Sequence, residues 1–151
     1  MGPLVSSGIA DMAYIPSPNT TLQSHQWPNL GDLILAGKRI ILFMDHMANK
    51  TQAPYILDEF VYMWQTPFAT LDGNFTCTID QPGNLTDDRE KLYIANHYLN
   101  TVIYEYGVDV LIADKANLSR SNAASGGYGT LGLAAEQCIG IFPPNLSPLV
   151  L

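Results

Sequence analysis

The chain has 151 residues, of which 47% are hydrophobic and 14% are charged, so its composition excludes a disordered protein and allows a sizeable core. The chain has 7 Lys and Arg residues against 14 Asp and Glu residues, which gives a net charge of 7 − 14 = −7. This charge argues against binding nucleic acid or anionic membranes through bulk charge. No run of about eighteen apolar residues exists, and the N-terminus has neither a basic nor an apolar region. We expect a one-domain-sized protein with no nucleic-acid partner, and neither a transmembrane segment nor a signal peptide in the chain as written.

Two features favour an extracellular location. Sequons of the form N-x-S/T are far denser than a cytosolic protein needs, and glycosylation is expected at Asn19, Asn49, Asn74, Asn84 and Asn117. The sixth sequon, at Asn145, is discounted because Pro148 follows it. The two cysteines, Cys77 and Cys138, permit one disulfide in an oxidising compartment, although two buried reduced thiols fit the sequence equally well. We expect that a secretion leader is missing from this sequence.

The first predicted elements are an irregular connection and a short helix. Residues 1–29 are rich in Pro, Ser, Asn and Thr, which favours a surface connection. Asn29 is placed to cap a helix that starts at Leu30, and Gly37 is placed to end it.

An apolar run comes next, and it stops abruptly at two polar residues. Ile40–Met44 predicts a strand buried on both faces, followed at once by Asp45 and His46. Strands of this kind belong to parallel sheets, whose carboxyl ends face ligands. Asp45 is therefore a candidate for the wall of a substrate pocket.

The remaining elements are predicted to alternate strands, helices and long loops. Phe60–Thr66 is aromatic and β-branched enough for a strand, residues 69–90 are rich in turns, and Lys91–His97 repeats the pattern of a buried strand ending at polar residues. The later expected elements are a helix over Leu99–Tyr106, a strand over Val108–Ala113, a helix from about Thr130 to Gln137, and an incomplete strand over 145–151. The fold class is therefore α/β with parallel strands.

A series of motifs resembles one known family. The motifs, in chain order, are Trp27-Pro28, Gly37-Lys38-Arg39-Ile40, Phe43-Met44-Asp45, Pro54-Tyr55-Ile56-Leu57-Asp58-Glu59-Phe60, Thr66-Pro67-Phe68, Asn96-His97 and Leu131-Gly132-Leu133. In this order they resemble the fungal secreted PLC-like phosphodiesterases, relatives of the phosphatidylinositol-specific phospholipase C X domain. The resemblance runs from about Ser6 to Pro144.

The resemblance implies a TIM-type (β/α) barrel, which typically needs about 250 residues. We therefore expect roughly the second half of such a barrel: residues 1–29 as an inter-strand connection, 30–144 as the partial barrel and 145–151 as a truncated or divergent strand. In the family, the two histidines that act as general base and general acid lie in the N-terminal half. The resemblance thus assigns no catalytic residue to this chain. It also implies that the chain works together with the N-terminal half of the barrel, which this sequence lacks.

The remaining site candidates are residues that follow predicted strands. By position, Asp45, Asn96 and His97 are candidates for a substrate pocket, and Gln65 replaces a Glu common in the family's Trp-Glu-Thr-Pro stretch. Each has an alternative: Asp45 could cap a loop, and a lone histidine is usually a structural hydrogen-bonding residue. The residues lack the tight spacing of metal ligands, so no metal and no cofactor are expected.

Two functions are compatible with these observations. One is a fragment of a secreted phosphoric diester hydrolase, acting in its complete form on a phospholipid or related phosphodiester by histidine acid/base catalysis, and inactive alone. The other is a non-catalytic secreted glycoprotein or pseudo-enzyme that at most binds a ligand.

Overall fold

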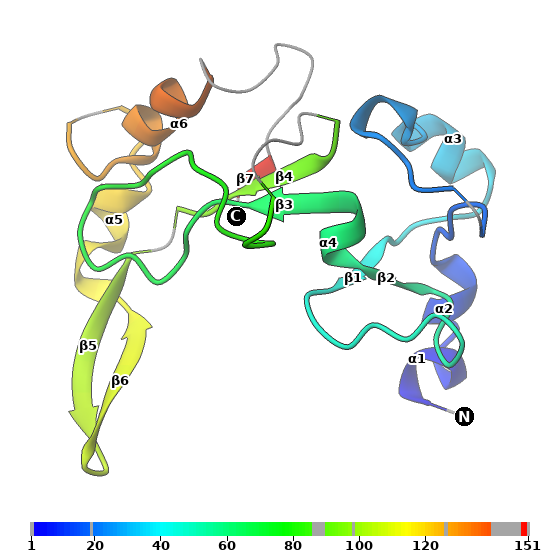
Figure 1. Ribbon diagram of the computed structural model, residues 1–151, viewed down its shortest axis with the longest axis horizontal. Helices are drawn as coiled ribbons and strands as arrows, with labels where there is room; N and C mark the ends of the chain where they lie inside the picture. Colours follow the sequence, from blue (N-terminus) through cyan, green and yellow to red (C-terminus); the bar gives the residue numbers. More distant parts are fainter. Residues whose placement is uncertain are drawn as a thin grey trace. The chain divides into compact units, whose positions relative to one another are not determined.

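The computed structural model describes residues 2–18, 20–85, 90–97, 99–125, 127–139 and 149–150. These residues form a mixed α/β protein with three small sheets, which confirms the expected α/β class (Figure 1). The chain divides into two compact units, residues 1–63 and residues 64–151. Among the described residues, none of the helices has the length and apolar character needed to cross a membrane.

The first unit contains short helices and one pair of strands. Its elements are α1 (Pro3–Ser6), α2 (Ile9–Met12), η1 (Ser24–Gln26), α3 (Leu30–Leu35), β1 (Leu42–Met44), β2 (Ile56–Asp58) and α4 (Glu59–Tyr62). Helix α3 forms as the sequence predicted. The side chain of Asn29 accepts a hydrogen bond from the Asp32 amide at 3.0 Å, and Gly37 follows the helix with φ of 73°.

Strand β1 differs from the strand that the apolar run predicted. It pairs in parallel with β2, as expected, but it covers only Leu42–Met44 and is half-buried, so the prediction of burial on both faces is wrong. A hollow of about 410 Å³ lies between helix α3 and the start of the apolar run, lined by Leu33 and Ile34 on one side and Ile40 and Ile41 on the other. Helix α3 therefore does not pack closely against the two residues that precede β1, and within β1 Met44 is the exposed residue.

The core of the first unit is a cluster of aromatic rings around Trp27. The ring of Trp27 lies 6.1 Å from Tyr14, 5.9 Å from Phe43 and 5.5 Å from Tyr62, measured between ring centroids. The rings meet at steep angles, which is the favoured geometry for aromatic pairs. The indole Nε1 of Trp27 is buried and has no hydrogen-bond partner among the described residues.

The second unit contains the other two sheets and the longest helix. Its elements are β3 (Met63–Gln65, which begins at the last residue of the first unit), β4 (Leu92–Ala95), β5 (Asn100–Glu105), β6 (Val108–Ala113), η2 (Lys115–Asn117), α5 (Leu118–Ser121), α6 (Leu131–Ile139) and β7 (Leu149–Val150). Strands β3, β4 and β7 form one sheet in that order, with β4 and β7 parallel. The predicted strand over Phe60–Thr66 is only partly correct, because Asp58 caps α4 by accepting from the Phe60 amide before β3 begins.

A disulfide and two stacked rings form the core of the second unit. Trp64 of β3 stacks on Tyr93 of β4 with centroids 5.2 Å apart, and the Cys77–Cys138 disulfide packs beside them. Cys77 belongs to an irregular segment, and Cys138 belongs to α6. The disulfide therefore ties a segment without a strand ladder to the helix that covers the sheet.

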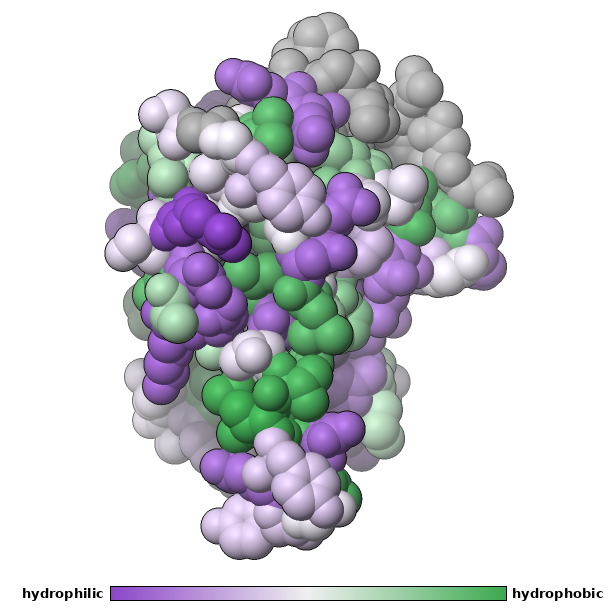
Figure 2. Space-filling view, turned by 90° about the vertical axis from the view of Figure 1, so that its left-hand side faces the viewer, coloured by the Kyte–Doolittle hydropathy of each residue, from purple (hydrophilic) through white to green (hydrophobic). Residues whose placement is uncertain are grey.

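The prediction of a helix over Leu99–Tyr106 is wrong. Residues 100–105 form β5, which pairs antiparallel with β6, and Tyr106 and Gly107 make the turn with φ of 52° and 83°. Two positive φ values are the signature of a tight hairpin turn, and the β-branched residues at this site suit a strand. The hairpin leaves hydrophobic side chains exposed, among them Val102, Tyr104, Tyr106, Val108 and Leu111. Figure 2 views the side of the molecule that carries this hairpin and shows hydrophobic side chains gathered in a patch.

Two glycines allow the irregular segment to approach the turn before α6. A Cβ atom on Gly73 would lie 2.6 Å from the Cα of Gly129, which is closer than real side chains come. Gly129 itself has φ of 79°, a conformation that favours glycine. The two backbones therefore touch directly, without a side chain between them.

Candidate functional site

The carboxyl ends of β3 and β4 meet and bring together polar residues that follow the two strands. Just past β3, the Thr66 amide donates to the Ile94 carbonyl at 3.0 Å, and the Asn96 amide donates to Thr66 Oγ1 at 2.8 Å. Thr66 is only 1% exposed. Two of the sequence-predicted residues, Gln65 and Asn96, are thereby placed side by side.

The side chains of Gln65 and Asn96 form a hydrogen-bonded pair. Asn96 Nδ2 donates to Gln65 Oε1 at 3.1 Å and to the Thr66 carbonyl at 2.7 Å, and Gln65 Nε2 donates to Gln81 Oε1 at 3.0 Å. Both N–H groups of Asn96 are therefore engaged within the protein. Among the residues that the structure describes, the second N–H of Gln65 Nε2 has no acceptor.

His97 occupies a buried position beside the same strand end. The side chain is 9% exposed, its Nε2 lies 2.6 Å from the Ser121 carbonyl oxygen, and its ring centroid lies 4.0 Å from that of Phe75. Because a carbonyl oxygen can only accept, Nε2–H is the donor of this hydrogen bond. Nδ1 is buried and has no partner in the described part of the chain.

Asp45 belongs to the first unit and follows β1. Its carboxylate is paired with Nδ1 of His46, and both side chains are largely exposed. The register that pairs Met44 with Asp58 brings further carboxylates to the same strand ends. Burial raises the pKa of Glu59, and the negative charges of Asp45 and Asp58 raise it further.

The structure thus groups three of the four predicted pocket residues in the second unit and places Asp45 in the first. Their role in a substrate pocket stays a prediction. Within the described ranges, no three His, Cys, Asp or Glu side chains are arranged to hold a metal ion. Sequence reasoning missed Thr66 and Ser121, and position immediately after a strand was the signal that could have found Thr66.

The predicted glycosylation sites differ in accessibility. Asn49, Asn74 and Asn84 are exposed, so their side chains face solvent. Asn117 is partly buried and its Nδ2 donates to Asp114 at 2.7 Å. Asn19 lies outside the described residues.

Comparison with known proteins identifies the family. The PI-PLC X 1 family model matches residues 2–145, so the chain belongs to the PI-PLC X domain family. Two similar proteins come from the fungus Arthroderma benhamiae. The chain is 43% identical over 147 residues to an uncharacterized secreted protein and 36% identical over 143 residues to PI-PLC X domain-containing protein 1.

The two alignments cover this chain and its relatives unequally. They span 95% and 93% of this chain but only 33% and 44% of the respective relatives. The chain therefore corresponds to less than half the length of either protein. No solved structure matches the chain.

Proposed function

We propose that this chain is part of a secreted phosphoric diester hydrolase, a phospholipase C-like enzyme acting on a phospholipid or related phosphodiester. The observation that carries the proposal is the family match over residues 2–145. The secreted relative from A. benhamiae supports an extracellular location. The parallel pairs β1–β2 and β4–β7 support the further proposal that the chain contributes about half of a TIM-type barrel.

In this proposal, the general base and general acid come from residues outside this chain. The base takes a proton from the hydroxyl that attacks phosphorus, and the acid gives a proton to the leaving oxygen. His97 is unsuited to either task, because Nε2 is held by the Ser121 carbonyl and the ring is buried against Phe75. His46 lies in the other unit and is paired with Asp45.

The proposed contribution of this chain is one wall of the substrate pocket. The Gln65–Asn96 pair stiffens the carboxyl ends of β3 and β4, and the free N–H of Gln65 can donate to a phosphate or hydroxyl oxygen. Both side-chain N–H groups of Asn96 are engaged, so the role we assign to this residue is to position Gln65. In the first unit, Asp45 is exposed at the end of β1 and is a separate candidate, which can accept a hydrogen bond from a substrate hydroxyl.

The test compares three proteins in hydrolysis of phosphatidylinositol vesicles and of bis(p-nitrophenyl) phosphate. They are the isolated chain, PI-PLC X domain-containing protein 1 of A. benhamiae, and a chimera in which residues 2–145 replace the matched region of that relative. We expect turnover by the relative and the chimera and none by the isolated chain. The relative with its matched region deleted is the negative control.

Each result bears on a different part of the proposal. Turnover by the isolated chain would show that the base and acid lie within it. A folded but inactive chimera beside an active relative would show that this chain cannot complete the enzyme, and a Gln65→Glu chimera would then test whether the missing charge is the reason.

The exposed sequons favour a second candidate function, a non-catalytic secreted glycoprotein. Asn49, Asn74 and Asn84 can accept glycans without unfolding, because their side chains face solvent. Expression in a fungal secretion host should give a mass that falls on glycosidase treatment. A glycosylated protein whose chimera remains inactive would favour this candidate, and an unmodified mass would remove it.

A further inference from the structure

The hollow beside helix α3 combines an apolar surface with access to solvent, and we call it the α3 hollow. Leu30, Leu33 and Ile34 line it on the helix, and Ile40 and Ile41 line it on the residues that lead into β1. Leu30 is 72% exposed and Ile34 is 47% exposed. The volume of about 410 Å³ is typical of small-molecule pockets. Apolar side chains exposed around one concave surface favour an apolar occupant.

Two adjacent cations, Lys38 and Arg39, also line the α3 hollow. They are the only two neighbouring basic residues in a sequence with a net charge of −7. Lys38 Nζ donates to the Asp11 carbonyl at 2.9 Å. Arg39 Nη1 donates to the carbonyls of Ile34 and Lys38, at 3.0 Å and 2.9 Å. Among the residues that the structure describes, neither cation is paired with a carboxylate, so both charges are available for an anion.

The hydrogen bonds of Arg39 determine which of its donors are left. A guanidinium has five N–H groups, and backbone carbonyls accept from Nη1 only. The N–H groups of Nε and Nη2 lie on one edge of the guanidinium, in the fork geometry that binds both oxygens of a carboxylate. The ammonium of Lys38 has two further N–H groups. The α3 hollow therefore has donors suited to one carboxylate beside an apolar surface.

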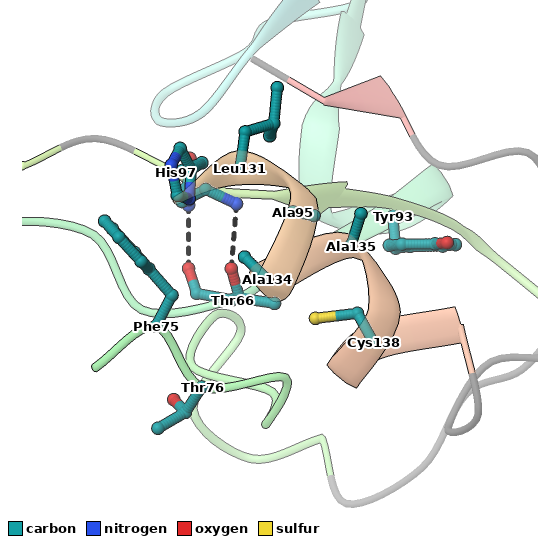
Figure 3. A pocket seen from close by; sticks show the side chains of 11 residues that line it. Thr66, Phe75, Thr76, Tyr93, Ala95, His97, Leu131, Ala134, Ala135 and Cys138 are labelled. Atoms are coloured by element: carbon teal, nitrogen blue, oxygen red, sulfur yellow. Dashed lines mark hydrogen bonds between the residues drawn. The ribbon is translucent and has the colours of Figure 1, made fainter. Parts of the chain in front are cut away.

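Charge distinguishes the α3 hollow from the apolar space between β4 and α6 in the second unit (Figure 3). None of the described residues that line that space is a Lys, Arg, Asp or Glu, so nothing there selects a charged ligand. The cations of the α3 hollow select an anionic head, and its apolar lining selects an alkyl body. An engineered cavity of about 150 Å³ holds benzene, so the α3 hollow has room for a chain of about ten carbons.

We propose that the α3 hollow binds a free fatty acid, with its alkyl chain against the leucines and isoleucines and its carboxylate on Arg39 and Lys38. A fatty acid is favoured over a phospholipid because it brings one alkyl chain into this volume and not two. The α3 hollow precedes β1 and Asp45 follows β1. The proposed site therefore differs from the candidate pocket wall, and it holds whether or not the chain forms part of a phosphodiesterase.

Titration calorimetry of the unmodified chain with decanoate, octanoate and 1-decanol is the primary test. Decanoate should bind most tightly. Octanoate should bind about tenfold more weakly because it has two methylene groups fewer. The neutral head of 1-decanol loses the charge-assisted hydrogen bonds and should also reduce affinity about tenfold. No binding of decanoate, or equal affinity for decanoate and 1-decanol, would overturn the proposal.

Two variants on α3 form a matched pair that locates the ligand. Ile34 and Leu35 are both exposed, but only Ile34 lines the α3 hollow. Ile34→Glu puts a carboxylate beside the two cations and should abolish decanoate binding. Leu35→Glu makes the same change in net charge outside the α3 hollow and should leave binding unchanged. Unchanged binding in the Ile34→Glu protein, or equal losses in both variants, would contradict the proposal.

A second pair of variants isolates the charge. Arg39→Gln should weaken decanoate binding about tenfold and leave 1-decanol binding unchanged. Lys50→Gln removes a cation that lies over the Tyr62 ring, outside the α3 hollow, and should change neither affinity. Equal losses for decanoate and 1-decanol in a folded Arg39→Gln protein would show that charge does not select the ligand and would overturn the proposal. If this variant does not fold, the comparison of decanoate with 1-decanol on the unmodified chain decides the same question.

Two other occupants of the α3 hollow would give different results. Sedimentation with vesicles of phosphatidylcholine and phosphatidylserine, without binding of decanoate, would assign it to a membrane surface. A dimer in analytical ultracentrifugation that does not bind decanoate would assign it to a second copy of the chain. Either result would overturn the proposal.

Discussion

The cores of the two units are held together in different ways. In the first unit, Trp27 and the three aromatic rings around it meet at steep angles, and the described residues of this unit include no covalent cross-link. In the second, a disulfide joins the irregular segment around Cys77 to helix α6 beside a stacked Trp64–Tyr93 pair. In this protein, a cross-link fixes the segment that has no strand ladder of its own, whereas the short segments of the first unit share an aromatic cluster.

Removing the disulfide should cause the largest loss of stability, and the loss should be confined to the second unit. The bridge closes a loop with a sequence separation of 61, and the loop entropy it removes from the unfolded chain corresponds to about 4 kcal/mol. Cys77→Ala with Cys138→Ala should therefore greatly lower the denaturant midpoint of the second unit. The measurement is urea unfolding followed by the fluorescence of Trp64, with Trp27→Phe as the background.

Reduction of the parent protein provides the control for that experiment. Reductant should destabilise the parent by a similar amount and leave the double alanine variant unchanged. A parent protein that unfolds at the same urea concentration with and without reductant would contradict the role assigned to the bridge.

Thr66→Val should cause the next largest loss of folding stability. The change keeps the shape of the side chain but removes the oxygen that accepts from the Asn96 backbone amide, and losing this hydrogen bond at a partly buried amide costs about 1 kcal/mol. Thr76→Val is the matched control, because Thr76 is exposed and should change stability by about 0.5 kcal/mol or less. Equal effects of the two changes would mean that the strand ends of the second unit do not depend on this contact.

The sequence predicted those parts of the fold whose signals are local. Asn29 and Gly37 define helix α3 because capping involves residues only a few positions apart. The spacing of Leu99, Val102 and Tyr106 also suited a helix, but pairing with β6 decided the structure, and that partner lies beyond any local window. The turn at Gly107 was the available signal for a hairpin.

The candidate site was predictable to a similar extent. Placement at the end of a predicted strand singled out Asn96, and the resemblance to the family's Trp-Glu-Thr-Pro stretch singled out Gln65; the structure brings the two side chains into hydrogen-bonding contact. The environment of His97 was not predictable, because Ser121 and Phe75 approach it from distant parts of the sequence. A histidine's environment depends on such long-range contacts, which residue type and spacing do not determine.

Glu59→Gln should give a small gain in the stability of the first unit, and this gain should depend on pH. The folded state holds the pKa of Glu59 above its ordinary value of 4.5, chiefly through burial, so its ionisation disfavours folding. The protonated carboxyl of Glu59 therefore contributes its full share of stability below pH 4.5, the ordinary pKa. This contribution is lost as the pH rises through the higher pKa that Glu59 has in the folded state. The variant should be more stable at pH 7 by about 0.5 kcal/mol or less, since the side chain is partly solvated.

Thermal unfolding at several pH values measures this difference. At pH 4 the variant and the parent should agree, because Glu59 is then largely protonated in both folded and unfolded states. A gain that persists unchanged at pH 4 would show that charge is not its cause.

Trp27→Phe should have the smallest effect on stability, and comparison with Trp64→Phe tests whether the two cores respond differently. Phenylalanine loses some contact with Tyr14 and Tyr62, but it also removes the buried Nε1–H that has no partner, so the two effects offset to about zero. Trp64→Phe, in the disulfide core, should cost more because its stack on Tyr93 is reduced. Equal losses at the two positions, compared by chemical denaturation, would contradict this account.

The contact between Gly73 and Gly129 has a consequence for the evolution of this protein. Because any Cβ at position 73 would meet the backbone of Gly129, the two positions cannot vary independently. A descendant that replaces Gly73 must also change the path of the turn before α6. We therefore expect Gly73 and Gly129 to be kept or lost together. In a relative that lacks one of the two glycines, the loop that contains the other should follow a different path.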